Sequence, residues 1–271
     1  MALSQRKRML IWGKTAPELS TKYYETVCTG AVLEDGTPIR LYPIPFRYMN
    51  DVDKFSKYQW ISATIAKSDS DPRPETYRID CETIETGAKI PPDNKEWFAR
   101  EKAMFCNPDW IFDSVDSLLK EQSTTGRSLG VVAPKEILSI NLKARPAEEQ
   151  VSFEEKKDSL RRLLNLDRAQ QRIFDEDMPS EMKDLDFIKN RIAVKWLCGA
   201  GKEHNTQILD WEVVELIRKF GESKALESVR KSLDLTTHAA RFFLGNFRLH
   251  PTAFSIVGLW YPKRMSSGLF A

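Results

Sequence analysis

The sequence predicts an α+β protein in which a small β-barrel-like unit at the N-terminus, of the OB, SH3 or PUA-like kind, packs with a C-terminal α+β unit. Two observations lead to this prediction. Short runs rich in β-branched and aromatic residues dominate residues 1–145, and turn residues separate them. After residue 145 the periodicity alternates between that of helices and that of strands. With 271 residues, 41% of them apolar, the chain can bury at least one large core.

The composition changes near residue 145, and we expect the domain boundary there. Residues 1–145 are predicted to form the β-rich barrel-like domain, and residues 187–271 the α+β domain. Residues 146–186 carry seven basic and 12 acidic side chains, and their leucines form only an irregular apolar stripe. We therefore interpret 146–186 as a charged linker with a surface helix.

The expected strands of the first half are short and bounded by turns. Asp35-Gly36 between two of them predicts a hairpin, because this pair readily adopts the positive φ of a tight turn. A proline near a first turn and an apolar face at helical spacing predict two helical insertions. The strands are expected at residues 8–12, 26–33, 39–44, 60–65, 76–81 and 129–140, the last interrupted at Pro134, and the helices at 17–24 and 110–122.

The second half is expected to mix both kinds of element. Alternating apolar residues predict a strand at 187–198, a helical pattern follows at 210–220, and the continuous apolar run at 253–261 predicts a final buried strand. Residues 223–244 are interpreted as helix in two pieces. The sequence contains no internal repeat and no low-complexity tract.

Composition and cysteine spacing indicate the compartment. The longest apolar runs, such as residues 254–260, are far shorter than the ~20 residues that a membrane helix needs, and the N-terminus lacks the apolar core of a signal peptide. We therefore expect a cytoplasmic protein with no membrane partner and no cofactor. The cysteines form no Cys-x-x-Cys pair, which predicts reduced thiols without a redox role at Cys28, Cys81, Cys106 and Cys198.

The net charge of +2 is divided unevenly along the chain. Residues 1–50 and 191–271 carry net charges of +3 and +5, whereas residues 51–145 and 146–190 carry −2 and −4. Basic ends and an acidic middle suggest one surface that faces an anionic partner and another that repels it.

The segment GTPIRLYPIPFR (residues 36–47) combines two arginines, a tyrosine and three prolines with the pattern of a strand. In a strand, Ile39 and Leu41 share one face, and Arg40 and Tyr42 share the other. An arginine beside an aromatic ring can hold a phosphate while the ring stacks on a base. The alternative is a strand whose prolines stiffen its exit, with Arg40 in a surface ion pair and Tyr42 half-buried.

Cations interleaved with aromatic residues recur further along the first half. Single-strand-binding proteins combine a basic groove with stacking platforms, and small barrels present both on their strands and rims. Acidic residues accompany each block, so local pairing such as that of Arg73 with Glu75 is the alternative. The residues predicted to bind nucleic acid are Lys14, Arg40, Tyr42, Arg47, Lys57, Trp60, Arg73 and Arg78.

Lys14 lies in a Gly-Lys-Thr sequence that suggests a phosphate loop. That loop needs a glycine five residues before Gly13, where the chain has Arg8, so the backbone nest for an anion is excluded. Two interpretations of Lys14 stay open: contact with a phosphate at the N-terminus of the helix expected at 17–24, or an ordinary solvated lysine.

Two further sets of residues suggest metal binding or catalysis. Cys198 and His204 supply two of the four ligands of a structural zinc site, but no second local pair is present, so we predict no structural metal. Asp210 and Glu212 place two carboxylates at a strand–helix junction, as Mg²⁺-dependent nucleases do. The same two residues also fit a helix N-cap and its first turn.

Four blocks of sequence, GKTAPELSTKYYETVC, IRLYPIPFR, DPRPE and FFLGNFRLHPTAFSIVGLWYP, resemble in content and order those of a family of uncharacterised bacterial proteins, over most of the chain. The resemblance implies a shared fold and transfers no activity. It also implies that family motifs include Lys14, Tyr23, Arg40, Arg47, Arg73 and Asp210-Trp211-Glu212.

The leading hypothesis is a nucleic-acid-binding protein for single-stranded or distorted DNA or RNA, serving with other protein subunits in a larger bacterial assembly such as a mobile-element or defence system. Two alternatives stay open. A Mg²⁺-dependent nuclease or phosphate-ester hydrolase would use Asp210 and Glu212. A protein-interaction adaptor would dock its partner on the aromatic and proline-rich blocks.

Overall fold

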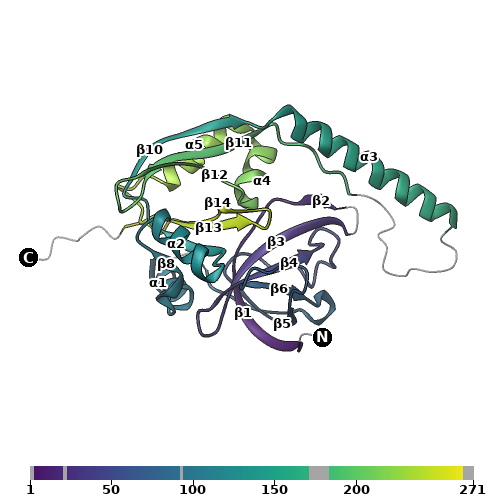
Figure 1. Cartoon of the computed structure of the whole chain (residues 1–271), viewed down its shortest axis with the longest axis horizontal. Coiled ribbons are helices and arrows are strands. Elements are labelled where there is room, and N and C mark those ends of the chain that lie inside the picture. Colours follow the sequence, from purple (N-terminus) through teal and green to yellow (C-terminus); the bar gives the residue numbers. More distant parts are fainter. Residues whose placement is uncertain (1–2, 21–22, 92–93, 171–182, 265–271) are drawn as a thin grey trace, which may run out of the picture.

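The protein combines a closed β-barrel with a second region of helices and sheets that lies against one side of the barrel (Figure 1). The predicted α+β class with an N-terminal barrel is therefore confirmed. The structure is a computed structural model, and it describes residues 3–20, 23–91, 94–170 and 183–264.

Five strands close the barrel: β1 (Gln5–Lys14), β3 (Tyr24–Leu33), β4 (Pro38–Ile44), β5 (Gln59–Lys67) and β6 (Thr76–Ile79). β1, β3 and β4 form an antiparallel meander, and β4 pairs in parallel with β6. β5 pairs with β6 and also with β1, and this last pairing closes the barrel. This connection order is that of an OB-fold, and closure removes the free sheet edges.

Alternation along the strands fills the barrel with apolar side chains. Ile39 and Leu41 of β4 point inward and are fully buried, as do alternate residues of the other strands. Burying such side chains is the main favourable term in folding. The barrel core consists of Met9, Ile11, Val27, Ala31, Ile39, Leu41, Ile44, Phe46, Phe55, Ile61, Ala63, Ile65 and Ile84.

The helix expected at 17–24 is absent from the described residues of that segment. Glu18–Ser20 instead forms a short strand, β2, which pairs antiparallel with β3. Leu19 is buried between an exposed and a half-buried neighbour, so the local period is two rather than 3.6. Leu19 packs with Leu160 and Leu185 from the second region, and this tertiary contact decides the conformation.

The first sheet of the second region has four strands in the order β14-β13-β9-β8. β9 (Leu129–Val132) and β13 (Arg241–Phe247) lie in its centre, between β14 (His250–Trp260) and β8 (Ile111–Phe112). Residues 241–244 were expected to be helical. They form a strand because they pair on both sides, and three consecutive apolar residues there are buried.

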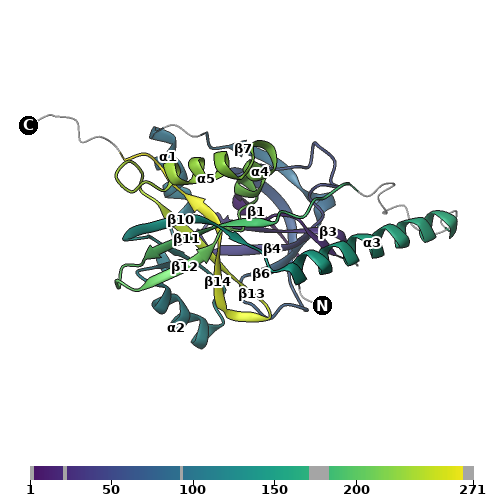
Figure 2. The same cartoon turned by 90° about the horizontal axis from the view of Figure 1, so that it is seen from above.

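The second sheet has β11 (Asn190–Leu197) between β10 (Glu136–Ala144) and β12 (Glu203–Gln207). It lies at the top of the molecule in Figure 1 and therefore on the viewer's side in Figure 2. Helices α4 (Trp211–Phe220) and α5 (Glu222–Ser232) pack together and share one apolar core with this sheet and with β13.

Strand pairing places the division of the chain earlier than the boundary expected at residue 145. The run expected at 129–140 splits at Pro134, as predicted, into β9 and β10. Both strands pair with strands that follow residue 187, so residues 129–144 belong to the sheets of the second region. The pairing of these strands with distant strands determines the region to which they belong, and local composition does not reveal that pairing.

Helices connect these parts. β7 (Glu85–Lys89) is a small strand that pairs antiparallel with β5. The helix α1 (Asn94–Met104) and the short 3-10 helix η2 (Pro108–Trp110) follow it. α2 (Val115–Thr125) begins later than expected, because Ser114 caps it through a reciprocal capping box. Part of the expected surface segment at 146–186 is the helix α3 (Ala147–Gln170), which extends away from the barrel (Figure 1); residues 171–182 lie outside the described residues.

Aromatic rings join the barrel to the second region. The Trp12 ring, on the outside of β1, stacks on Phe243 of β13 with 4.6 Å between centroids and lies 6.0 Å from Trp110. Gly30 of β3 leaves the space for this ring, since a Cβ there would overlap the Trp12 indole. The barrel and the second region therefore share a continuous apolar interface.

No helix in the described part of the chain is both long enough and apolar enough to cross a membrane.

We predict that Gly30→Ala lowers the free energy of unfolding by roughly 1–3 kcal/mol or more, the usual cost of overpacking a core, because the methyl group displaces Trp12. Chemical denaturation monitored by tryptophan fluorescence measures the change. Gly87→Ala on the exposed β7 is the matched control and should cost clearly less. An unchanged midpoint for Gly30→Ala would show that Trp12 does not need this space.

Candidate functional site

A cleft of about 650 Å³ lies between the outer face of the barrel and the second region. The barrel side is formed by β3, by β4 and by the connections between β1 and β3 and between β5 and β6. The opposite side comes from the start of α3, the start of β11, α4 and the hairpin between β13 and β14. Its charged lining residues are Glu18, Arg40, Asp71, Arg73, Arg145, Glu148, Glu149, Lys156, Asp186, Arg191, Arg218 and Arg248.

The predicted alternation along β4 is confirmed. Ile39 and Leu41 point into the barrel core, and Arg40 and Tyr42 lie on the outer face and line the cleft. The expected exposure of Arg40 is wrong, because the second region covers this face and leaves the residue only 3% exposed. The alternative of a surface ion pair is excluded for the same reason.

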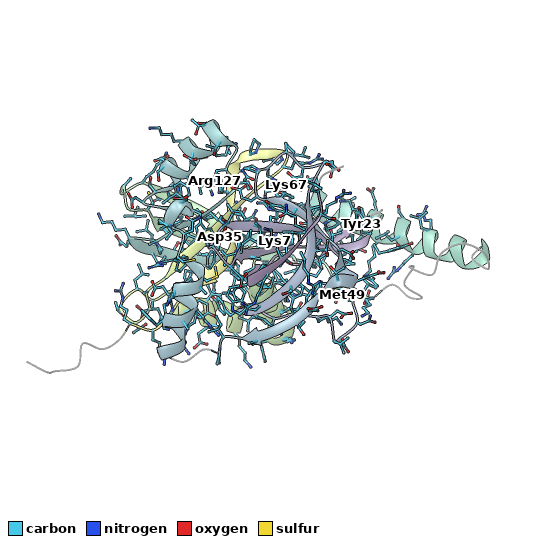
Figure 3. The ribbon with its side chains drawn as sticks, turned by 90° about the horizontal axis from the view of Figure 1, so that it is seen from below. Lys7, Tyr23, Asp35, Met49, Lys67 and Arg127 are labelled. Carbon is cyan, nitrogen blue, oxygen red and sulfur yellow. The ribbon has the colours of Figure 1, made fainter. Side chains whose placement is uncertain are left out.

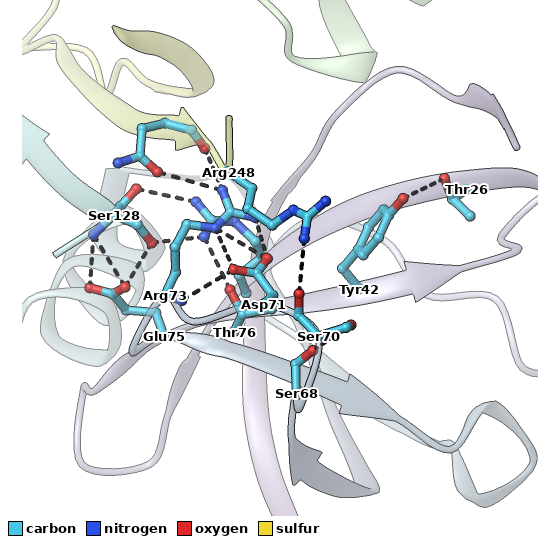
Figure 4. Close-up of polar contacts among 12 residues, drawn as sticks. Thr26, Tyr42, Ser68, Ser70, Asp71, Arg73, Glu75, Thr76, Ser128 and Arg248 are labelled. Carbon is cyan, nitrogen blue, oxygen red and sulfur yellow. Dashed lines mark hydrogen bonds and ion pairs between the residues drawn. The ribbon is translucent and has the colours of Figure 1, made fainter. Parts of the chain in front are cut away.

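Arg40 donates to Thr76 of the barrel and to Ser128 of the second region, and both of these partners are labelled in Figure 4. Its Nη1 lies 2.7 Å from Ser128 Oγ and 3.3 Å from Thr76 Oγ1, and its Nη2 lies 3.2 Å from the Ser128 carbonyl oxygen. Ser128 in turn donates through Oγ to Glu75 at 2.7 Å. Burial lowers the pKa of Arg40, but a guanidinium stays charged, so its positive charge is held by neutral partners next to the cleft.

Arg73 pairs locally, but with Asp71 rather than with Glu75. Its Nε and Nη2 donate to the Asp71 carboxylate at 2.9 and 2.5 Å, and its Nη1 donates to the Asn246 carbonyl oxygen at 2.6 Å. Burial opposes ionisation of Asp71, yet the hydrogen bonds from Arg73 hold its pKa below the usual value. Arg73 therefore fastens the connection between β5 and β6 to the β13–β14 hairpin.

Tyr42 and Arg248 both line the cleft, and their side chains lie close together in the view of Figure 4. Tyr42 is 39% exposed, and its hydroxyl lies 3.3 Å from Thr26 Oγ1. Arg248 is exposed and donates to the Ser70 carbonyl oxygen at 3.2 Å. Among the described residues, no carboxylate lies within 4.0 Å of its guanidinium. Its charge is therefore available to an anion.

Two more arginines lie on the far wall and share one carboxylate. Arg145 and Arg191 contact Glu149 at 2.8 and 3.3 Å, and the Arg145 guanidinium lies 3.9 Å above the Phe187 ring. Burial and then the nearby charge of Arg145 lower the pKa of Arg191. With seven cationic and five acidic lining side chains, the cleft has an excess of positive charge.

Sequence reasoning missed Arg145, Arg191, Arg218 and Arg248. The first three come from the last residue of the expected β-rich domain, an expected strand and an expected helix, with no distinguishing pattern, and only folding brings them to one wall. For Arg248 a signal existed, because it stands between Phe247 and Leu249, two apolar residues that the structure leaves 40% and 77% exposed.

Five of the eight predicted binding residues lie away from the cleft. Trp60 is half-buried beneath the Arg8 guanidinium at 4.6 Å. Arg78 is exposed, and its Nη2 lies 3.4 Å from Asp69 Oδ2. Its strand, β6, pairs with β5, whose Lys67 is labelled in Figure 3. The other three are Lys14, Arg47 and Lys57. Although β6 pairs with β4, Arg78 is not among the residues that line the cleft.

Lys14 is surrounded by aromatic rings instead of solvent. Its Nζ lies 3.7 Å from the centroid of Phe46 and 5.2 Å from that of Trp211, and it donates to the Phe55 carbonyl oxygen at 2.9 Å. Burial lowers its pKa to about 8. Neither interpretation of Lys14 fits the structure, since the described residues 15–20 and 23–24 form no helix and the ammonium group is half-buried among aromatic rings.

Asp210 and Glu212 share Lys57. Lys57 Nζ lies 3.3 Å from Asp210 Oδ2 and 3.4 Å from Glu212 Oε2, and it donates to the Leu259 carbonyl oxygen at 3.1 Å. Asp210 also caps α4 by accepting from the Glu212 amide at 2.8 Å. An ion pair and a helix cap therefore account for both carboxylates. Lys57, predicted to contact nucleic acid, is buried in this pair.

Cys198 and His204 belong to the hairpin between β11 and β12. Cys198 is buried, and the His204 ring packs 5.1 Å from Trp196. The buried Nε2 of His204 has no hydrogen-bond partner in the described part of the chain, and burial lowers the pKa of this histidine. The described residues contain no group of three or more side chains arranged to hold a metal ion.

Two family models match the chain. One, a domain of unknown function (DUF8758), matches residues 5–105, and the other, a domain of unknown function (DUF8757), matches residues 111–271. The second match covers more than half of the chain, which therefore belongs to the DUF8757 family. No curated protein matches the chain. The gap between the two matches, residues 106–110, contains η2, and the second match begins at β8, the first strand of the second region's sheets.

We predict that Arg40→Met lowers the free energy of unfolding by at least ~2 kcal/mol, because it leaves the buried oxygens of Ser128 and Thr76 without their donor. Thermal and denaturant unfolding measure the loss. Arg78→Met, which removes an exposed arginine from β6, should change stability by no more than ~0.5 kcal/mol. Equal effects of the two variants would contradict the role assigned to Arg40.

Arg47 belongs to a buried ion pair that makes stability depend on pH. Its Nη1 lies 3.0 Å from Glu25, a carboxylate that is 1% exposed and whose Oε1 has no hydrogen-bond partner among the described residues. Burial raises the pKa of Glu25 to about 7 despite the opposing effect of Arg47.

The native state therefore binds more protons than the unfolded state between pH 4.5, the ordinary value for Glu25, and about 7. We predict that its contribution makes the free energy of unfolding fall as pH rises through this window. Glu25→Gln should remove that part of the slope, which denaturant unfolding of both proteins at pH 4.5, 6 and 8 measures. Parallel pH profiles of the two proteins would contradict the raised pKa.

Proposed function

We propose that the protein binds single-stranded nucleic acid in the cleft between the barrel and the second region. The observation that carries the proposal is the position of the cleft on the barrel. OB-folds bind oligonucleotides and oligosaccharides on the face of their second and third strands and with the connections between strands one and two and strands four and five. In this barrel those elements are β3, β4, residues 15–23 and residues 68–75.

All four elements line the cleft. β3 contributes Thr26 and Cys28, and β4 contributes Arg40 and Tyr42. The connection after β1 contributes residues 15–19, and the connection after β5 contributes Asp71 and Arg73. Three of the sequence blocks that resemble one family, GKTAPELSTKYYETVC, IRLYPIPFR and DPRPE, thus meet at one site.

Charge and aromaticity favour nucleic acid over a neutral oligosaccharide. The lining has an excess of positive charge, and Arg248 offers a guanidinium without a carboxylate partner in the described structure. Tyr42 presents a partly exposed ring beside it, which can stack on a base. A phosphate beside Arg248 and a base on Tyr42 would use the two groups in their ordinary roles.

The experiment is a binding series in which fluorescent single-stranded and duplex DNA and RNA are titrated at several salt concentrations, with a neutral oligosaccharide as a further arm. Phosphate contacts must weaken binding linearly on a logarithmic salt scale. We expect single strands to bind, and we expect their affinity to fall as the salt concentration rises. Absence of binding to every nucleic acid at low salt would overturn the proposal.

We predict that Arg248→Ala weakens binding to every single-stranded sequence and reduces the salt slope by about 0.7, as expected for one lost phosphate contact on a single strand. The matched control is Arg264→Ala, another exposed arginine whose guanidinium donates to a backbone carbonyl oxygen, that of Leu235. An identical slope for the Arg248 variant and the parent protein would remove Arg248 from the site.

Tyr42→Ala is predicted to cost roughly 1–3 kcal/mol of single-strand binding, the range for a lost stacking platform, and to leave the salt slope nearly unchanged. Tyr42→Phe keeps the ring and loses only the hydroxyl contact with Thr26, so it should bind almost as the parent does. Equal losses in the two variants would assign the effect to the hydroxyl and contradict stacking.

A further inference from the structure

We infer that the cleft binds two consecutive nucleotides as one unit, with one base on Tyr42 of the barrel and the neighbouring base on Phe247 of the β13–β14 hairpin. This inference rests on the proposed function and specifies its ligand. Its basis is that both rings line the cleft and are exposed, and that one cation, Arg248, adjoins both of them.

Five aromatic side chains line the cleft in the described part of the chain, and three of them are engaged within the protein. The Trp12 ring is buried and stacks on Phe243. Phe153 and Phe187 pack on each other, with 5.5 Å between their ring centroids. A ligand therefore finds its stacking surfaces on the other two rings.

Those two rings are Tyr42 and Phe247, which are 39% and 40% exposed. Neither belongs to an apolar core of the residues that the structure describes. A single exposed apolar side chain on a protein surface is ordinary. Two exposed rings in one cleft with an excess of positive charge instead match the stacking platforms of single-strand-binding proteins.

The β13–β14 hairpin holds Phe247 in a defined place. β13 is buried from Phe242 to Asn246 and becomes exposed at Phe247. The pairing with β14 shifts register between Asn246 and Phe247, and Asn246 Nδ2 donates to the Pro251 carbonyl oxygen at 2.7 Å. The Asn246 carbonyl oxygen accepts from Arg73 of the barrel side. Register shifts of this kind re-aim side chains and are common beside functional sites.

Arg248 supplies the charge that a phosphate between two bases requires. It follows Phe247 in the chain, and its side chain lies close to that of Tyr42 in the view of Figure 4. A dinucleotide has the same sequence of groups, namely base, phosphate and base. Because every base has a face that can stack, we expect the pair of rings to accept all bases with similar affinity.

The test measures the affinity of the full chain for thymidine monophosphate, for the thymidine dinucleotide with one phosphodiester, and for a longer single-stranded oligothymidine. We expect the dinucleotide to bind at least tenfold more tightly than the monophosphate. The monophosphate carries the larger negative charge, so charge alone predicts the opposite order. Phe247→Ala and Tyr42→Ala should each weaken dinucleotide binding at least fivefold, as expected for a lost stacking platform.

Further variants separate stacking from apolar contact. Phe247→Tyr keeps a ring and should bind as the parent does, whereas Phe247→Leu keeps apolar bulk without a ring and should weaken binding as Phe247→Ala does. Leu249→Ala is the matched control and should bind as the parent does, because Leu249 lies at the same hairpin tip, is 77% exposed and does not line the cleft.

The other outcomes distinguish this inference from the proposed function. A dinucleotide that binds no more tightly than the monophosphate, or parental affinity of Phe247→Ala, would overturn the two-base inference; binding of the longer strand would still support single-strand binding. Equal losses in Phe247→Tyr and Phe247→Ala would contradict stacking on this ring. If the longer strand does not bind at low salt, both proposals fail.

Discussion

A charged guanidinium buried at the boundary between barrel and second region sets the arrangement of the molecule. Arg40 leaves the outer face of β4 and reaches Ser128, the residue that precedes β9, while Ser128 holds Glu75 beside the parallel strand β6. A buried charge is costly unless its donors are satisfied, so this network fixes where the chain can return to the barrel. The position of β9, and through it of β13 and β14, follows from that requirement.

An apolar contact carries the same boundary further. Trp12 stacks on Phe243 and approaches Trp110, so one barrel strand shares an aromatic cluster with the central strand of a sheet. The polar network gives the boundary its geometry and the aromatic cluster supplies apolar burial. Together they place the second region over β3 and β4, the face that other OB-folds leave open.

Several cations that suggest a binding surface are therefore structural. Lys14 lies among Phe46, Phe55 and Trp211, and Lys57 lies between two carboxylates of the second region. Each connects the barrel to α4 or to its N-cap. The sequence pattern of a lysine beside aromatic residues is the same whether the lysine binds a phosphate or packs on an aromatic ring of its own chain. The cleft is instead charged by arginines from segments that are far apart in the sequence.

The sequence by itself determined the class of the fold and the two faces of β4. Turn residues and short β-branched runs mark the barrel strands, and strict alternation puts Ile39 and Leu41 inside and Arg40 and Tyr42 outside. These features are local, because they depend on backbone geometry and on a period of two. Tertiary structure alone decided which outer residues are exposed, where β2 and β13 replace expected helices, and which arginines share a wall. Those outcomes depend on strand register and on contacts between residues more than 80 positions apart, such as Arg40 with Ser128, and no local pattern encodes the partner of a buried charge.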